Sequence, residues 1–577
     1  MATVSVAALA LTGCTTTNDE GVVAGSTVSI AETNELSSFN PDSATGNVDI
    51  NAQIDYFTQS SFFYLDTVPE VVYDEGFGTV ELVSDDPLTV KYTINEGVTW
   101  SDGVAIDADD MLLSWASQSG YYDDANYNDD GEIDSGNVYF SPAGSTSGID
   151  LTAFPELGDD GRSMTLTYSE PFADWNLISP VGVPAHVVAE NAGIDPEGVV
   201  AFFEGLPEGD EAAPAEANAE LRAMADFWNS GFDTATLPGD ASLYLASGPY
   251  IVDEWDAGQS VVLVANESYT GDLKPAFEQV VVQFIPDATA QVQALENGEV
   301  DIINPQASAD TLASLEGIAG VDVKTGDTGS YDHIDLNFSS PVFQDENVRE
   351  AFLKTIPREQ ILDALIRPLD PEAEVLNSQT LFPGVPGYDE AVAANGSDAY
   401  AEVDIEGATA LLGGATPTIR LAYNNANPNR VDAFLSIQAS AAEAGFIIED
   451  GGLGSEAWGA ALSVTDSWDA FIFGWSTVGV GVVGNDQLFG STGGGNFGKY
   501  SNAEADALMQ ELAVTVDSGE QLDIILQVEN LIWADKFGLP LYISPGVQAI
   551  GPNVTGVEYN AWQTGPIWNY WEWTPAS

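Results

Sequence analysis

The sequence predicts an α/β protein with mixed β-sheets and at least two domains. The chain has 577 residues, which is longer than a single hydrophobic core usually serves. Residues 247–301 read as strands followed by a capped helix, and residues 418–444 again give a strand and then a helix. A hydrophobic fraction of 44% with 10% aromatic residues is ordinary for a folded globular protein.

The central stretch begins as an antiparallel hairpin. The β-rich runs 250–255 and 261–265 flank a turn at 256–259. A third run at 278–285 contains three consecutive valines, a pattern typical of a strand that is buried on both faces. We therefore expect three neighbouring strands here.

A βα unit follows this hairpin and strand. Pro286 ends the third strand, and Asp287 is a suitable N-cap for the helix that follows. Gly298 fits a left-handed C-cap, and residues 300–303 begin another strand. We expect the chain to leave one sheet at Ile285 and to begin a βα unit there.

Apolar periodicity predicts the remaining elements. The expected strands, in chain order, are 27–30, 90–100, 162–168, 331–338, 418–423, 468–475 and 539–543. The expected helices are 50–65, 108–115, 346–354, 430–444, 502–513 and 519–533.

The charge balance restricts the possible partners. Lys and Arg total 13 against 91 Asp and Glu, a formal net charge of −78. A surface this negative repels nucleic acid and anionic lipid headgroups. It suits cationic solutes, divalent metal ions or a salty habitat, and the habitat is the explanation we favour.

Few residues are available for nucleophilic catalysis. One cysteine excludes an intramolecular disulfide, and with two histidines it cannot build a Cys/His zinc site. We interpret both histidines, His186 and His333, as structural. The sequence has no nucleophile elbow, zinc motif or Walker loop, and carboxylates are too abundant for a pair of them to indicate a hydrolase. We expect no enzyme activity.

The first residues resemble a lipoprotein leader. A short apolar run at 4–11 is too short for a membrane span but suits a signal peptide, although no Lys or Arg precedes it. Leu11-Thr12-Gly13-Cys14 resembles the lipobox of bacterial lipoproteins, in which the cysteine is acylated. The resemblance implies that Cys14 anchors the chain to the outer face of the cell membrane.

An acidic loop at 126–137 has the spacing of a calcium-binding loop. Oxygen ligands fall at positions 1, 3, 5, 7 and 9, with the required glycine, Gly131, at position 6. These ligands are Asn126, Asn128, Asp130, the Glu132 carbonyl and Asp134. Asn137 stands where a bidentate Glu is usual, so a polar surface loop is the alternative. The possible ion is a structural Ca²⁺, and we expect no other cofactor.

Three long motifs resemble one protein family. They are SGPY…W…G….L..N..Y.G…P followed by LENGEVD, the strand and turn VKYTINEGVTWSDG, and LNFSSPVFQDENVREAF. Together they resemble the extracellular solute-binding proteins of peptide-type ABC importers, the dipeptide and oligopeptide family five, in a lipoprotein branch like that of actinobacteria. The resemblance implies a bilobal periplasmic-binding-protein-like fold of type II, with hinge crossover strands and an extra inserted subdomain.

The resemblance also implies domain boundaries. The expected divisions are a signal and tether at 1–25, lobe I at 26–72, 238–286 and 536–577, an inserted subdomain at 73–237, and lobe II at 287–535.

The function implied by the resemblance is ligand binding without catalysis. A monomer would bind a peptide or related small solute in the cleft between its lobes and deliver it to an ABC permease in the membrane. Two alternatives stay open: a cell-surface regulatory lipoprotein that kept the fold without transport, and, with less support, a carboxylate-based hydrolase.

Candidate ligand-binding residues follow from sheet ends that would face this cleft. They are Phe39, Asn40, Asn337, Tyr423 and Trp475. In peptide-binding relatives an aspartate three residues after the Gly-Trp tryptophan pairs with the peptide α-ammonium, but Val478 stands at that position here. Asp486 is an alternative partner. The change argues against free dipeptides and makes the regulatory alternative credible.

Overall fold

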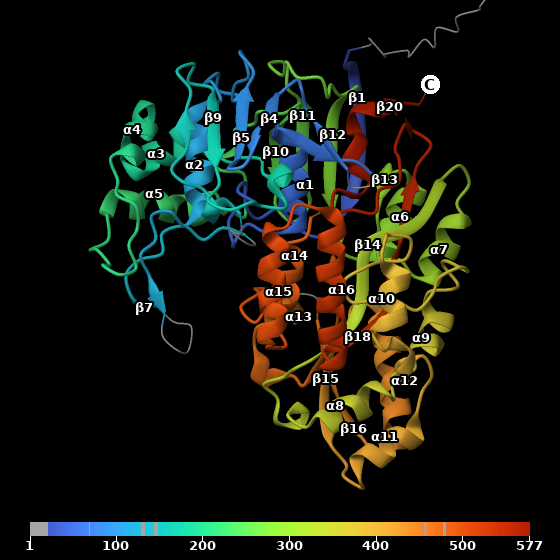
Figure 1. The fold of residues 1–577 in the computed structure, drawn as a ribbon. Coiled ribbons are helices and arrows are strands. Elements are labelled where there is room, and N and C mark those ends of the chain that lie inside the picture. The colour runs from blue at the N-terminus through green and yellow to red at the C-terminus, as the bar shows by residue number, and fades with distance from the viewer. Residues whose placement is uncertain are drawn as a thin grey trace, which may run out of the picture.

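The chain folds into two lobes with a third body of structure beside the first lobe (Figure 1). The computed structural model describes residues 21–67, 70–127, 133–143, 148–454, 457–476 and 481–576. Within these ranges, no helix is both long enough and apolar enough to cross a membrane.

One ten-stranded sheet runs through both lobes. Its order is β10 (Tyr250–Asp256), β11 (Ser260–Ala265), β12 (Phe277–Phe284), β1 (Val23–Glu32), β13 (Ile302–Ile303), β18 (Gly538–Ile550), β14 (Asp322–Leu336), β17 (Ala470–Ser476), β15 (Thr418–Asn424) and β16 (Ile447–Leu453). β1 pairs in parallel with β12 and β13, and β15 in parallel with β16 and β17, so the sheet is mixed.

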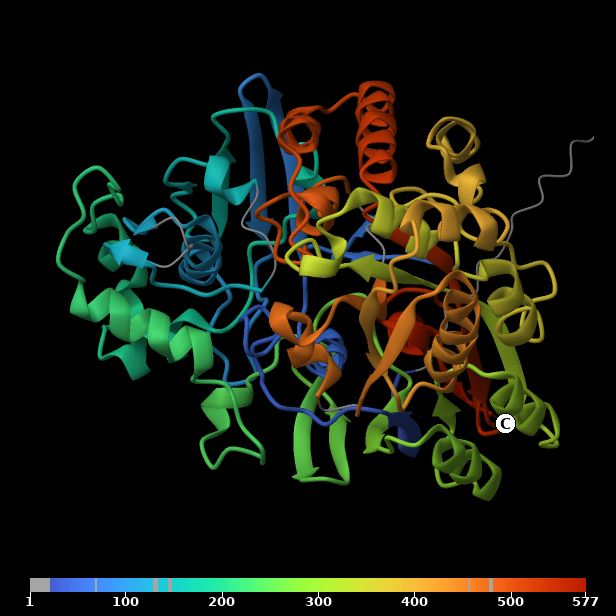
Figure 2. The same ribbon diagram turned by 90° about the horizontal axis from the view of Figure 1, so that it is seen from below.

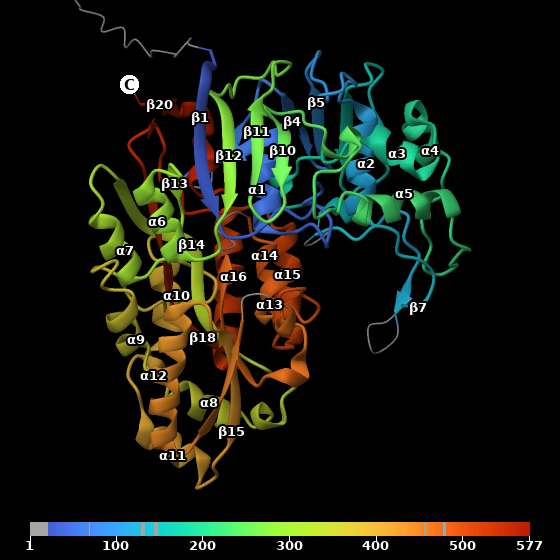
Figure 3. The same cartoon turned by 180° about the vertical axis from the view of Figure 1, so that it is seen from behind.

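Two long antiparallel strands, β14 and β18, are shared by both lobes (Figure 3). The first part of β14, residues 322–327, pairs with the end of β18, which also pairs with β13. The last part, residues 331–336, pairs with the beginning of β18 and with β17. The β14–β18 register shifts between Asp327 and Tyr331, around Gly329, whose φ of 59° is left-handed. We name residues 328–330 the crossover.

In lobe I, helices cover both faces of this half of the sheet. One face carries α1 (Asp49–Thr58) and the C-terminal 3-10 segment Gly565–Glu572, and the other carries α6 (Ala288–Asn297) and α7 (Ala309–Glu316). Two small antiparallel strand pairs, β2 (Phe63–Leu65) with β3 (Val71–Tyr73) and β19 (Val554–Thr555) with β20 (Thr574–Pro575), complete this lobe.

The inserted subdomain has a core of its own, formed by buried residues between Phe62 and Leu245. Its four-stranded sheet has the order β4 (Gly78–Asp85), β5 (Leu88–Ile94), β9 (Ser163–Thr167) and β8 (Glu156–Leu157). The helices are α2 (Ala108–Ser119), α3 (Ala185–Ala192), α4 (Val199–Glu204) and α5 (Ala219–Ser230), and a hairpin joins β6 (Asn126–Tyr127) and β7 (Ile133–Ser135). In Figure 2 this subdomain, drawn in cyan to green, lies to one side of lobe II, drawn in yellow to orange.

Lobe II surrounds the other end of the sheet with helices. They are α8 (Glu346–Leu353), α9 (Arg358–Leu365), α10 (Tyr388–Ala394), α11 (Ile405–Leu412), α12 (Pro428–Ala444), α13 (Trp458–Leu462), α14 (Gly484–Phe489), α15 (Ala503–Val514) and α16 (Ser518–Ala534).

Several aspartates have a local role at helix starts. Asp107 accepts a hydrogen bond from the Asp109 amide and completes a capping box with Asp110 at the start of α2. Aspartates cap α6, α8, α11 and α16 in the same way. A side-chain oxygen at this position satisfies amides that have no partner in the helix, and its negative charge suits the helix N-terminus.

The bilobal α/β fold with mixed pairing and shared strands is confirmed, and two details differ from expectation. The chain does not leave lobe I at Ile285, because β13 pairs with β1 and the chain stays on this half of the sheet until the crossover. The valine-rich strand β12 alternates buried Val280 and Val282 with half-buried Val281, so only one of its faces is fully covered.

Candidate functional site

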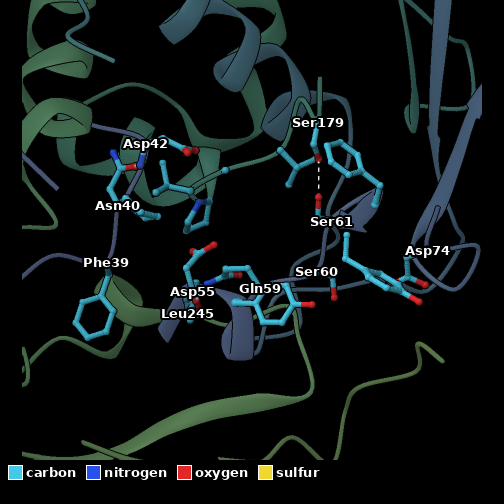
Figure 4. A pocket seen from close by; sticks show the side chains of 18 of the residues that line it. Phe39, Asn40, Asp42, Asp55, Gln59, Ser60, Ser61, Asp74, Ser179 and Leu245 are labelled. Carbon is cyan, nitrogen blue, oxygen red and sulfur yellow. Dashed lines mark hydrogen bonds between the residues drawn. The ribbon is translucent and has the colours of Figure 1, made fainter. Parts of the chain in front are cut away.

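A cavity of about 410 Å³ lies between α1 of lobe I and the inserted subdomain. Residues within 39–42, 55–64, 177–184 and 243–245 supply most of its wall, and Tyr570 adds a side chain from the C-terminal segment. This volume is in the range of small-molecule sites. Figure 4 shows Asp42 and Asp55 on one side of the cavity and Asp74 on the other.

The loop before α1 is held in place by a buried asparagine. Asn40 is 1% exposed, and its side-chain nitrogen donates to the Trp228 carbonyl at 2.7 Å. Its side-chain oxygen accepts from the amide of Asp42 at 3.2 Å. Both polar ends of the Asn40 side chain are thus bonded within the protein. These bonds fix the loop and position Asp42 at the cavity.

Asp42 and Asp55 face the cavity without a counter-charge. Neither carboxylate accepts a hydrogen bond or an ion pair from the described part of the chain, although Asp42 is near Gly182. Burial raises the pKa of Asp42 to about 6. Burial, and after it the charge of Asp42, raises the pKa of Asp55 well above its usual value.

A third carboxylate belongs to the opposite wall. Asp74 is 7% exposed, and its Oδ1 accepts from the Gly76 amide at 2.9 Å. Burial raises the pKa of Asp74 despite the hydrogen bonds to backbone amides. Hydroxyls lie nearby, with Ser61 Oγ and Ser179 Oγ 2.8 Å apart across the two walls (Figure 4).

Aromatic rings complete the cavity. Phe39 lies 5.8 Å from Tyr244, measured between ring centroids, and packs edge-on against Trp255. The Tyr56 hydroxyl donates to the Trp568 carbonyl at 2.8 Å. Tyr570 is 3% exposed, and among the described residues its hydroxyl has no hydrogen-bond partner. The wall is thus aromatic and acidic, and the described residues that line it include no Lys, Arg or His.

One wall of the cavity continues into a contact between the lobes. Asp174 precedes the lining segment 177–184, and its carboxylate accepts hydrogen bonds from the amides of Val482, at 2.8 and 3.0 Å, and Val483, at 3.0 Å. The Ala173 amide also donates to the Ala513 carbonyl at 2.8 Å. Burial raises the pKa of Asp174, although the amide bonds work in the opposite direction.

The structure does not bring the five predicted ligand residues together. Phe39 and Asn40 line the cavity, whereas Asn337, Tyr423 and Trp475 belong to lobe II and do not. Asn337 is 1% exposed and its side chain donates to the Thr465 and Trp468 carbonyls at 2.7 and 2.9 Å. These bonds tie the end of β14 to residues 465–468 inside lobe II.

The two predicted aromatic residues of lobe II have different surroundings. Tyr423 is 4% exposed, stacks on Phe434 at 4.8 Å between ring centroids and donates its hydroxyl to Asp450 at 3.0 Å. Trp475 is half-buried, stacks on Phe497 at 5.6 Å and pairs through its backbone with Tyr331, next to the crossover. A ligand role stays a prediction for both.

Several other predictions involve residues outside the described ranges. Cys14, Asn128, Asp130, Glu132 and Val478 are among them. Asn126 and Asp134 are described on β6 and β7, and the Asn126 side-chain nitrogen donates to the Glu211 carbonyl at 2.8 Å. Asp486 lies on α14, where burial, and after it the charge of Asp506, raises its pKa. The calcium site stays a prediction.

Sequence reasoning missed Asp42, Asp55, Asp174 and Tyr570. In a chain with 91 acidic residues no single aspartate stands out, and all four owe their role to a partner or a cavity that is distant in sequence. The order Asn40-Pro41-Asp42 was the one usable signal, because a turn that places Asn40 near a cleft also places Asp42 there.

Comparison with known proteins gives consistent matches over nearly the whole chain. An uncharacterized lipoprotein of Mycobacterium leprae is 25% identical, with 98% of this chain and 96% of the relative covered. The oligopeptide-binding protein OppA of Mycobacterium bovis is 25% identical over 82% of this chain and 72% of the relative. Among solved structures, a periplasmic EDTA-binding protein, EppA, superposes with a TM-score of 0.81 at 23% identity and covers 96% of this chain and 98% of its own.

The family is shown by a match over most of the chain. Residues 79–496 match the bacterial extracellular solute-binding proteins, family 5 Middle. This range contains most of the inserted subdomain, β10 to β12, both βα units and most of lobe II. The chain belongs to the bacterial extracellular solute-binding proteins of family 5.

Proposed function

We propose that this protein is the solute-capturing component of an ABC importer. It would bind a peptide or a related small solute, without changing it chemically, and deliver it to a permease in the membrane. Anchoring through an acylated Cys14 would keep it at the outer membrane face, in line with a relative named as a lipoprotein. An oligopeptide-binding relative supports the ligand class.

The observation that carries the proposal is the pair of strands shared by the lobes. β14 and β18 pass from one lobe to the other, and their pairing is irregular at the crossover. A short irregular segment can absorb the backbone changes of a hinge, while the lobes on either side move as rigid bodies. Asp174 marks a place where the inserted subdomain meets lobe II.

Binding and closure can be coupled through the segment that follows Asp174. Residues 177–184 line the cavity, and Asp174 accepts hydrogen bonds from lobe II. A solute that contacts residues 177–184 would bind more tightly when Asp174 holds this segment against lobe II, as in the closed arrangement, than when that contact is broken. This difference in affinity is what shifts the population toward the closed form and lets a permease recognise the loaded protein.

Mass spectrometry of solutes that co-purify with the protein tests the proposal. The protein is purified without denaturant, the bound solutes are released by acid, and the stripped protein is titrated with them while small-angle X-ray scattering is recorded. We expect a recovered solute and a smaller radius of gyration after it is added back. Asp174→Ala is the matched variant and should bind the solute with less compaction.

Two other results would overturn the proposal. An empty cavity, with no change in scattering across peptide libraries, would favour the regulatory lipoprotein, which Val478 makes a specific alternative. Turnover of an ester, glycoside or peptide would favour the hydrolase.

A further inference from the structure

We propose that the cavity beside α1 binds a positively charged organic group, an ammonium or a guanidinium, through Asp42 and Asp55. The proposal rests on the proposed function and names the class of solute for it. The cation can belong to a free amine or to the basic side chain of a peptide, and the experiment below separates the two.

The first support is the pair of carboxylates. Asp42 and Asp55 both line the cavity, and neither has a hydrogen-bond or ion-pair partner among the described residues. Both side chains are half-buried, and a carboxylate withdrawn from bulk water without a partner is costly, so proteins normally provide one. Here the two carboxylates line a cavity of about 410 Å³, which a ligand can fill.

The second support is independent of the carboxylates. Tyr570 lines the same cavity, is 3% exposed and comes from the C-terminal segment. Its hydroxyl has no partner in the described part of the chain, although a buried tyrosine hydroxyl usually finds one. The hydroxyl can donate to or accept from a polar group of the ligand, and the surrounding rings of Phe39 and Tyr244 give an aromatic wall that attracts cations.

The composition of the lining argues against an anionic ligand. The titratable groups that face Asp42 and Asp55 are acidic or phenolic: Asp74, Tyr56, Tyr64, Tyr244, Tyr269 and Tyr570. With no Lys, Arg or His among the described lining residues, an anionic ligand would find no positive side chain in the wall and would be repelled by the aspartates when they are ionised.

An organic cation fits better than a metal ion. Among the described residues, no three His, Cys, Asp or Glu side chains approach closely enough to hold a metal. The cavity also has room for a body of organic-ligand size, and its aromatic rings offer nothing to a bare divalent ion, which prefers oxygen ligands.

Isothermal titration calorimetry with pairs of probes that are matched in size but differ in charge tests the proposal. The first pair is phenethylamine, a free cation at neutral pH, and 2-phenylethanol, its neutral counterpart. The second pair is N-acetylated glycyl-lysyl-glycine amide and its norleucine analogue. We expect at least one cation to bind at least about tenfold more tightly than its neutral counterpart. Binding of phenethylamine indicates a free amine, and binding of the lysyl peptide alone indicates a basic side chain.

Variants assign the effect to the cavity. Asp55→Asn and Asp42→Asn should each remove most of the preference for the cation, while Asp253→Asn, which neutralises an exposed carboxylate on β10, should leave it unchanged. Thermal unfolding should show Asp42→Asn and Asp55→Asn to be at least as stable as wild type without probe, which separates lost binding from lost folding.

Three results would overturn the inference: equal binding of charged and neutral probes, cation binding that both variants retain, or no probe bound. The scattering experiment then decides whether the proposed function still holds. Closure on a recovered neutral or anionic solute would leave the proposed function intact and refute the acidic ligand site alone. Absence of closure with any solute would refute the proposed function itself.

Discussion

Two buried carboxylates of lobe II, Asp332 and Asp469, each have an arginine beside them, whereas the half-buried carboxylates of the cavity, Asp42 and Asp55, have no cation partner among the described residues. In lobe II, Arg430 donates to Asp332 with Nη2 and Oδ1 2.8 Å apart, and the Tyr542 hydroxyl donates to the same carboxylate at 3.1 Å. Arg420 forms a bidentate pair with Asp469, with both N–O distances at 2.9 Å. Around the cavity no such partner is present among the described residues.

The pKa directions follow this difference. Burial would raise the pKa of Asp332 and of Asp469, but the neighbouring arginine outweighs it and both values are lowered. Glu529 accepts hydrogen bonds only from neutral donors, and burial raises its pKa. The pKa of Asp42 is raised as well. Lobe II therefore uses its few arginines to stabilise its own fold, whereas the cavity leaves its carboxylates available for a cation from outside.

The largest expected effect is on the paired side of this comparison. Asp332→Ala should lower the free energy of unfolding by about 3–5 kcal/mol, because it leaves the Arg430 guanidinium buried without its partner. Urea denaturation followed by tryptophan fluorescence measures the change, and Asp253→Ala is the exposed control. A loss below about 1 kcal/mol would place this pair with ordinary surface ion pairs.

The next effect concerns a carboxylate that is paired across the lobes. Asp174→Ala removes the acceptor for the Val482 and Val483 amides and should weaken solute binding by about tenfold to a hundredfold. The free energy of unfolding of each lobe should change much less, because the contact lies outside the lobe cores. Calorimetry with the recovered solute checks the affinity, and an unchanged affinity would show that Asp174 is not part of closure.

A smaller effect of opposite sign is expected inside the cavity. Asp55→Asn should raise the free energy of unfolding of the empty protein by about 1–2 kcal/mol, because it removes a carboxylate that pays for burial without a partner. Chemical denaturation at neutral pH is the measurement. A destabilised variant would mean that Asp55 has a structural partner after all.

The strands and helices could be predicted from sequence where local signals agree. β10, β11, β12 and α6 were expected within one or two residues, because turn residues, alternation and an Asp cap all indicate the same boundaries. The helix predicted at 50–65 instead ends at Thr58, and Phe63–Leu65 forms a short strand. Aromatic residues in that stretch pack against lobe I and the inserted subdomain, which apolar periodicity alone cannot distinguish from a helix face.

Long-range features were outside the reach of the sequence. The first half of β14, DVKTGDTGS, is polar and contains two glycines, so its strand character comes from pairing with β18 more than two hundred residues away. The cavity depends on Asp42, Asp55 and Tyr570 meeting from three separate segments. Phe39 and Asn40 were predicted from their place after the first strand, and those two do line the cavity.

A pH dependence of opposite sign is also expected in the two regions. The pKa of Asp42 in the folded state, about 6, exceeds its value in an unfolded chain, so the folded state binds more protons between about pH 4 and 6. Its contribution to the free energy of unfolding therefore falls as the pH rises through this window. Asp332 has a lowered pKa, so its contribution is present above about pH 4 and is lost as the pH falls.

Paired denaturation curves can isolate the Asp42 contribution. The stability difference between Asp42→Asn and wild type should grow as the pH rises from about 4 to 6 and then level off. A difference that stays constant over this window would show that Asp42 has an ordinary pKa.

The most direct test of the account is the number of protons released when a cation binds. Calorimetry of phenethylamine binding near pH 6, repeated in buffers with different ionisation enthalpies, measures that number. If a cation binds beside Asp42 and Asp55, it favours their ionised forms, so wild type should release protons and the double variant Asp42→Asn, Asp55→Asn should release none. Binding without proton release, or the same release from the double variant, would contradict the account.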